Sequence, residues 1–97
     1  MTIKLLPDAE DDLYKALEYY QGIDRKLKDK FINELDNTFE KILKFPNLYP
    51  FETQTSQKIL MHKFPYIILY EKYQNIIMIL AIFHTKRNPR DLTDRIL

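Results

Sequence analysis

The sequence predicts an α+β fold in which an antiparallel helical hairpin packs on a mostly antiparallel four-stranded sheet, in the order β-α-α-β-β-β. Two stretches with helical periodicity lie between residues 8 and 44, with only Gln21–Ile23 between them, which predicts a helical hairpin. Three strand-like segments follow, separated by turn residues. The last of them, Ile76–Phe83, is apolar at every position, which is typical of a strand in the middle of a sheet.

The first two elements are a short strand and a helix. The apolar segment from Ile3 to Leu6 stops at Pro7 and predicts the strand. Asp8 is expected to begin the helix, because carboxylates in a first turn are stabilised by free N–H groups and the helix dipole. Gly22, the only glycine of the chain, is expected to end this helix as a left-handed C-terminal cap. The apolar stripe of the helix consists of Ala9, Leu13, Ala16, Leu17 and Tyr20.

A second, longer helix is expected to begin at Asp24, whose carboxylate can cap it, and to end at Pro46. Helical spacing places large apolar side chains on one face. These are Leu27, Phe31, Leu35, Phe39 and Ile42. The apolar faces of the two helices predict that the hairpin lies on one face of the sheet.

The C-terminal half is predicted to supply most of the sheet. Residues 46–57 carry two prolines and a polar run, which predicts a loop. Strands are then expected at Lys58–Lys63, Tyr66–Tyr73 and Ile76–His84, with a tight turn at Gln74-Asn75. Asn88-Pro89 ends the last strand, and a short C-terminal helix is expected from Arg90 to Leu97.

Length and composition favour one domain over residues 1–97, with 45% apolar residues to form its core. The chain has no cysteine, which excludes disulfides and thiolate metal sites. The N-terminus carries no long apolar stretch, and the longest apolar run is far too short to cross a bilayer. We therefore expect a cytoplasmic protein that does not enter a membrane.

The net charge of +1 conceals an asymmetry between the two halves of the chain. Residues 1–49 hold eight basic and ten acidic side chains, a balance of −2. Residues 58–90 hold six basic side chains and one acidic one, a balance of +5. A basic half favours a polyanionic partner, either nucleic acid or an acidic protein segment, although an ordinary solvated face explains the charge equally well.

Few residue patterns point to catalysis. The single glycine excludes a glycine-rich phosphate loop, and no HExxH, EF-hand or nucleophile-elbow motif is present. The carboxylates of Asp8, Glu10, Asp11 and Asp12 could bind a divalent ion, but the start of a helix explains them better. No metal site and no cofactor are predicted.

The candidate binding residues gather after the buried strand. They form a basic group that could hold a phosphate or carboxylate, namely Lys63, His84, Lys86, Arg87 and Arg90. His84 is either an acid–base group or a residue hydrogen-bonded locally at the strand end. Tyr66 and Tyr70 share one face of their strand and either stack on bases or pack under the helices.

Three motifs, together with the order of elements, resemble the RelE/ParE toxins of type II toxin–antitoxin systems. The first runs from Ala9-Glu10-Asp11-Asp12-Leu13 to Glu18-Tyr19-Tyr20. The second is Phe64-Pro65-Tyr66-Ile67-Ile68-Leu69-Tyr70. The third is Ile79-Leu80-Ala81-Ile82-Phe83-His84-Thr85-Lys86-Arg87-Asn88-Pro89. Across nearly the whole chain, the three appear in the order and at the spacing of that family.

The resemblance implies a growth-inhibiting toxin, associated with plasmid stabilisation and neutralised by a cognate antitoxin. RelE-like members cut mRNA in the ribosomal A site without a metal, whereas ParE-like members poison DNA gyrase. The implied partners are therefore the antitoxin and either gyrase or the ribosome with its mRNA. A homodimer, or a heterotetramer with the antitoxin, is compatible with the resemblance.

Two apolar residues favour the ParE-like branch. Ile67 stands where the nuclease branch carries an arginine, and Leu60 stands where a catalytic lysine is expected. Neither side chain can transfer a proton or neutralise developing charge. If the chain is a nuclease, the candidate catalytic residues are Arg87, His84, Lys63 and Tyr66. A non-toxic protein-binding module of the same fold is the third alternative.

Overall fold

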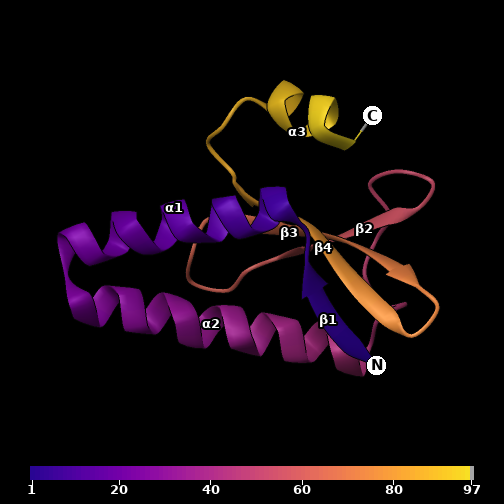
Figure 1. The fold of residues 1–97 in the computed structure, drawn as a ribbon, viewed down its shortest axis with the longest axis horizontal. Helices are drawn as coiled ribbons and strands as arrows, with labels where there is room; N and C mark the ends of the chain where they lie inside the picture. Colours follow the sequence, from indigo (N-terminus) through magenta and orange to yellow (C-terminus); the bar gives the residue numbers. More distant parts are fainter. Residues whose placement is uncertain (97) are drawn as a thin grey trace.

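A computed structural model describes residues 1–96 and has the predicted order of elements (Figure 1). The elements are β1 (Thr2–Leu5), α1 (Pro7–Ile23), α2 (Arg25–Lys44), β2 (Ser56–Leu60), β3 (Tyr66–Tyr73), β4 (Ile76–His84) and α3 (Pro89–Ile96). The predicted α+β class, the helical hairpin and the short C-terminal helix are all confirmed.

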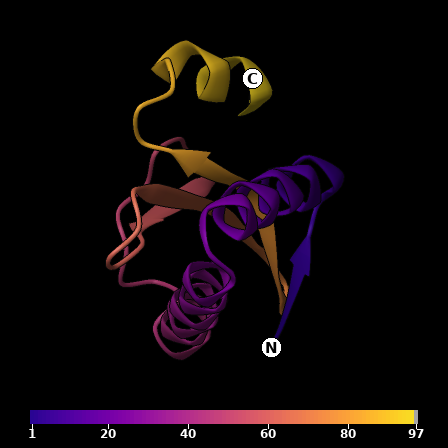
Figure 2. The same cartoon turned by 90° about the vertical axis from the view of Figure 1, so that its left-hand side faces the viewer.

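The sheet has the strand order β1-β4-β3-β2. β1 pairs with β4 in parallel, whereas β4 with β3 and β3 with β2 are antiparallel, so the sheet is mostly antiparallel as predicted. The apolar strand β4 lies in the middle of the sheet, which confirms its predicted place. α1 and α2 lie on one side of the sheet and α3 lies on the other (Figures 1 and 2).

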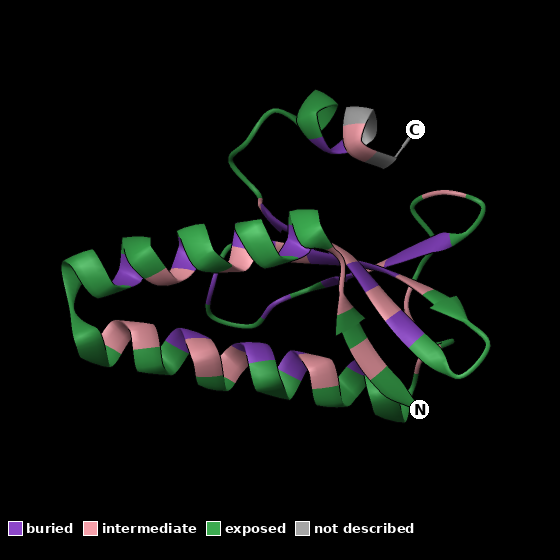
Figure 3. Ribbon diagram, in the orientation of Figure 1, coloured by how far each residue is buried: buried purple, intermediate pink, exposed green. Residues whose placement is uncertain are grey.

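The main core lies between the helical hairpin and the sheet. Its fully buried side chains include Phe31 and Ile42 of α2, Ile68 of β3 and Ile79 of β4. Buried positions recur along the inward faces of both helices, as their periodicity predicts (Figure 3). Phe39 is only partly buried against this core. The opposite face of the sheet carries a smaller cluster consisting of Leu69, Ala81, Phe83 and Leu92.

The predicted end of the first helix is wrong. Gly22 lies inside α1 and has no positive φ. The chain reverses at Asp24, which is extended and joins the two helices alone. Its N–H donates to Tyr20 O (2.9 Å) and its carboxylate accepts from Lys26 N–H (3.0 Å), so no left-handed cap is needed. α1 begins at Pro7 rather than Asp8, because proline suits the first helical position.

Several strand boundaries also differ from prediction. β1 is shifted one residue toward the N-terminus. β2 begins at Ser56 rather than Lys58, because Ser56 and Gln57 pair with the long strand β3, and it ends at Leu60. Lys63 lies outside any strand, with a φ of 70°. α3 begins at Pro89, and Leu97 lies outside the described residues.

Candidate functional site at the end of the central strand

β4 places its C-terminal residues at the surface through local backbone hydrogen bonds. Thr85 N–H donates to Pro65 O (2.8 Å), which holds the end of β4 against the start of β3. Arg87 N–H then donates to His84 O (3.0 Å), so the chain turns directly after the strand. Asn88 Oδ1 accepts from Arg90 N–H (3.0 Å) at the beginning of α3. The His84–Arg90 segment is therefore fixed by the sheet on one side and by a helix start on the other.

His84 is hydrogen-bonded within its own turn. Its Nδ1 accepts from Lys86 N–H (3.1 Å), so the neutral ring carries its proton on Nε2 and is a donor there. Tyr66 pairs with His84 across the sheet, and the two rings meet edge to face at 5.1 Å. The local hydrogen bond, one of the two interpretations of His84, is present in the structure.

Tyr66 and Tyr70 belong to the core rather than to an exposed stacking surface. Tyr66 packs against the rings of Tyr20 (6.3 Å) and Phe31 (5.3 Å), and it is buried. Burial and a hydrogen bond with Tyr20 raise the pKa of Tyr66, so its phenol stays protonated near neutral pH. Tyr70 is fully buried, and its hydroxyl donates to Pro46 O (2.8 Å). Packing under the helices is therefore the correct interpretation of both tyrosines.

A cavity of about 280 Å³ lies between α1 and the end of β4. Its polar lining residues are Asp12, Lys15, Tyr66, His84 and Arg87. Arg87 is held across this end of the sheet, because its guanidinium lies 5.0 Å from the centre of the Phe83 ring and 3.8 Å from the Asp91 carboxylate. The cations Lys15 and Arg87, with the imidazole of His84, suit a carboxylate or phosphate group of a partner.

Only some of the predicted site residues lie around this cavity. Arg87, His84 and Tyr66 line it, whereas Lys63, Lys86 and Arg90 are not among its lining residues. The Lys63 ammonium lies 3.7 Å from Glu34 of α2, and the side chains of Lys86 and Arg90 are exposed. Lys15 of α1 also lines the cavity, although the sequence analysis did not single it out.

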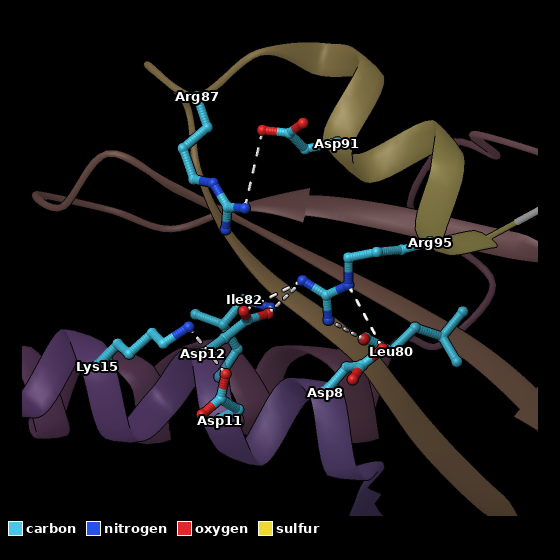
Figure 4. A network of polar contacts seen from close by, with 9 residues as sticks. All are labelled: Asp8, Asp11, Asp12, Lys15, Leu80, Ile82, Arg87, Asp91 and Arg95. Atoms are coloured by element: carbon cyan, nitrogen blue, oxygen red, sulfur yellow. Dashed lines mark hydrogen bonds and ion pairs between the residues drawn. The ribbon is translucent and has the colours of Figure 1, made fainter.

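A buried ion pair holds α3 beside the cavity (Figure 4). Asp12 Oδ2 accepts from Ile82 N–H (2.9 Å) and from Arg95 Nη1 (2.9 Å), and Asp12 Oδ1 lies 3.1 Å from the same Nη1. Arg95 Nη2 donates to Leu80 O (3.0 Å), and its Nε lies 3.7 Å from Asp8. One carboxylate of α1 and one guanidinium of α3 therefore bond to the same strand.

The pair satisfies backbone groups that β1 leaves open. β1 pairs with β4 only as far as Ile79, and Leu6 N–H still reaches Ile79 O (3.0 Å). Farther along β4, Asp12 and Arg95 take the place of a strand by bonding to Ile82 and Leu80. Asp12 was interpreted as a helix-start carboxylate, and that interpretation is wrong. One sequence signal could have indicated this role of Asp12: helical spacing places its charged side chain within the apolar stripe of α1, between Ala9 and Ala16.

The face of the sheet opposite the hairpin is apolar where an RNA-cleaving site would need polar groups. Leu60 of β2 pairs with Ile67 of β3, which in turn pairs with Phe83 of β4, so the three form one row across the sheet. Leu60 is 65% exposed, Ile67 is half-buried, and Phe83 is covered. Lys58 is the nearest cation along β2, and it is paired with Glu52 at 2.8 Å. This row offers no proton donor or acceptor.

Among the side chains that the structure describes, which leave out those of residues 93, 94, 96 and 97, no group of three or more is suited to binding a metal ion. Among residues 1–96, no helix combines the length and apolar character that crossing a membrane requires.

A helical hairpin on one face of a four-stranded sheet, with His84 and Arg87 at the end of β4, is the arrangement that the resemblance to RelE/ParE toxins implies. The model of the family described as "ParE toxin of type II toxin-antitoxin system, parDE" matches residues 3–89, and the chain belongs to this family. No curated protein sequence matches the chain.

A solved structure described as "Chromosomal ParDE TA system from P. aeruginosa" has a similar fold, with a TM-score of 0.69. The similarity covers 89% of this chain and 97% of that one at 16% sequence identity, so it shows the fold alone. The predicted ParE-like membership is confirmed by the family match.

Proposed function

We propose that this ParE-type toxin inhibits growth by binding a protein target, DNA gyrase, and that a cognate antitoxin neutralises it in the cytoplasm. The observation that carries the proposal is the apolar row formed by Leu60, Ile67 and Phe83. Metal-free RNA cleavage needs groups that move protons and stabilise developing charge, and this row has none. Without such groups, binding to a protein is the mode of action that this end of the sheet supports.

The residues around the cavity support the same conclusion. The Tyr66 phenol is buried with a raised pKa, and His84 Nδ1 is occupied by Lys86 N–H. The Tyr66 phenol is therefore not available as a general base near neutral pH, and His84 Nδ1 already serves a local hydrogen bond. Lys15 and Arg87 are paired only at the surface, with Asp11 (3.0 Å) and Asp91 (3.8 Å), so both cations can exchange these partners for a carboxylate of the target.

We propose that the antitoxin covers this basic end of the sheet and the helical hairpin with an acidic segment that orders as it binds. The chain from residue 58 to residue 90 carries a balance of +5, which favours an acidic partner. A segment that is disordered before binding can wrap such a surface.

Purified gyrase tests the target directly. The toxin should inhibit supercoiling or accumulate cleaved gyrase–DNA complexes, and Arg87→Glu should weaken this effect at least about tenfold because it inverts a central charge of the site. Lys30→Glu on the exposed side of α2 is the control, since it makes the same change in charge outside the site. If gyrase is unaffected and translated mRNA is cut in the A site, the proposed target is wrong.

A further inference from the structure

The loop from Phe45 to Phe51 presents three large apolar side chains to solvent. Phe45 is 55% exposed, Leu48 68% and Phe51 61%. They fall within seven consecutive residues between α2 and β2, whereas isolated exposed apolar residues are ordinary on a protein surface. Several exposed apolar side chains close together are typical of an interaction surface.

The backbone of this loop is held by two buried side chains of the sheet. The Gln57 amide donates to Pro46 O (2.8 Å) and to Tyr49 O (3.0 Å), and the Tyr70 hydroxyl donates to Pro46 O (2.8 Å). Gln57 and Tyr70 are both buried, so water does not compete strongly for these bonds. The loop therefore has a defined shape before any partner arrives.

Further contacts fix the C-terminal end of the loop. Lys58 N–H donates to Pro50 O (2.9 Å), and Phe51 forms a bridge with Gln57. The Tyr49 side chain packs against the main core, so one aromatic ring of the loop anchors it while its neighbours stay outside. A surface whose shape is set in advance loses little conformational entropy on binding.

Cations border the loop. Lys41 and Lys44 lie in the last turn of α2 and are exposed, and neither forms an ion pair with a side chain that the structure describes. A complementary partner therefore has an apolar pocket with carboxylates at its rim.

We propose that the Phe45–Phe51 loop is an anchor with which the toxin contacts its folded protein target, and not its antitoxin. Protruding side chains on a fixed backbone require a pocket that is already formed. A segment that orders only on binding supplies no such pocket, and it fits grooves instead. The assignment rests on the proposed function, because it names a contact surface for that target.

The test measures the affinity of purified gyrase for the wild-type toxin and for the double variant Leu48→Ser with Phe51→Ser. Both side chains point into solvent, so circular dichroism should show an unchanged thermal midpoint. The double variant should bind gyrase at least about tenfold more weakly. Ile23→Ser is the matched control, because Ile23 is 57% exposed at the end of α1 and lies outside the loop.

Binding to the protein encoded beside the toxin gene separates target from antitoxin. The double variant should retain wild-type affinity for that protein. Equal losses for both partners, or unchanged gyrase binding by the double variant, would overturn the anchor while leaving gyrase as the target. If the wild-type toxin does not bind gyrase, the proposed target fails and the anchor assignment falls with it.

Discussion

Replacing Asp12 by Asn should destabilise the protein more than any other loss of a single carboxylate in α1. The Asp12 side chain is 8% exposed, and its partner Arg95 is 19% exposed. The asparagine oxygen can still accept from Ile82 N–H, but its NH₂ group would face the Arg95 guanidinium in place of an acceptor. The guanidinium would then stay buried without its main counter-charge.

The loss in the free energy of unfolding depends on whether the unpaired Arg95 guanidinium can reach water. Removing one partner of a buried ion pair costs about 3–5 kcal/mol when the remaining charge cannot escape. Here α3 can detach and carry Arg95 into water. Detachment exposes the buried side chain of Leu92, and this exposure costs about 1.5–3 kcal/mol. The loss of the bond to Leu80 O adds about 1 kcal/mol. Detachment therefore limits the destabilisation to about 2.5–4 kcal/mol.

Urea denaturation and thermal melting, both followed by circular dichroism, measure this change. A loss of about 3 kcal/mol lowers the melting temperature by roughly 12–24 °C in a domain of this size. Asp11→Asn is the matched control, because Asp11 is 61% exposed and pairs only with Lys15 at the surface, so it should cost less than about 1 kcal/mol.

A double-mutant cycle with Arg95→Met isolates the pair. Once Arg95 is gone, Asp12→Asn should cost less than it does in the wild type, because no guanidinium remains without a counter-charge. Hydrogen exchange at the Ile82 amide gives a local readout, since Asp12 accepts from that group. Equal stabilities for the Asp12 and Asp11 variants, or strict additivity in the cycle, would refute this interpretation of the network.

Three further predictions concern the loop, the sheet and the basic end. Gln57→Leu should lower the free energy of unfolding by about 1–3 kcal/mol, since it leaves Tyr49 O without a donor; a smaller loss in urea titration would contradict this. Burial, with a smaller contribution from Tyr49, raises the pKa of Tyr70 to about 12. The contribution of the protonated phenol to the free energy of unfolding should therefore be fully present below about pH 10 and be lost toward pH 12. Tyr70→Phe should reduce this loss. Affinity for the antitoxin should decrease with added salt, and it should depend less on salt in Arg87→Ala; a salt-independent affinity would argue against an acidic partner.

The arrangement of helices and strands could be predicted because local signals determine it. Helical spacing identified the buried face of α2, including Phe31 and Ile42. The lack of alternation in Ile76–Phe83 placed β4 correctly in the middle of the sheet. Element ends were less predictable, since pairing with β3 decides where β2 begins and an extended Asp24, rather than Gly22, ends α1.

The site could be predicted only where it is contiguous in sequence. Arg87 and His84 follow a buried strand directly, so their location at its exposed end was evident. Asp12 and Arg95 are separated by 83 residues, and no local pattern indicates that two helices place them on one strand edge. Gln57 likewise lay in a segment interpreted as a polar loop, because its role depends on carbonyl groups that only the folded chain places beside it.

Purified gyrase incubated with the wild-type toxin tests the proposed mode of action most directly. Inhibition of supercoiling or accumulation of cleaved complexes, reversed by the antitoxin and weakened by Arg87→Glu, is the expected result. Unaffected gyrase, together with A-site cuts in translated mRNA that disappear in Arg87→Ala, would contradict action through protein binding.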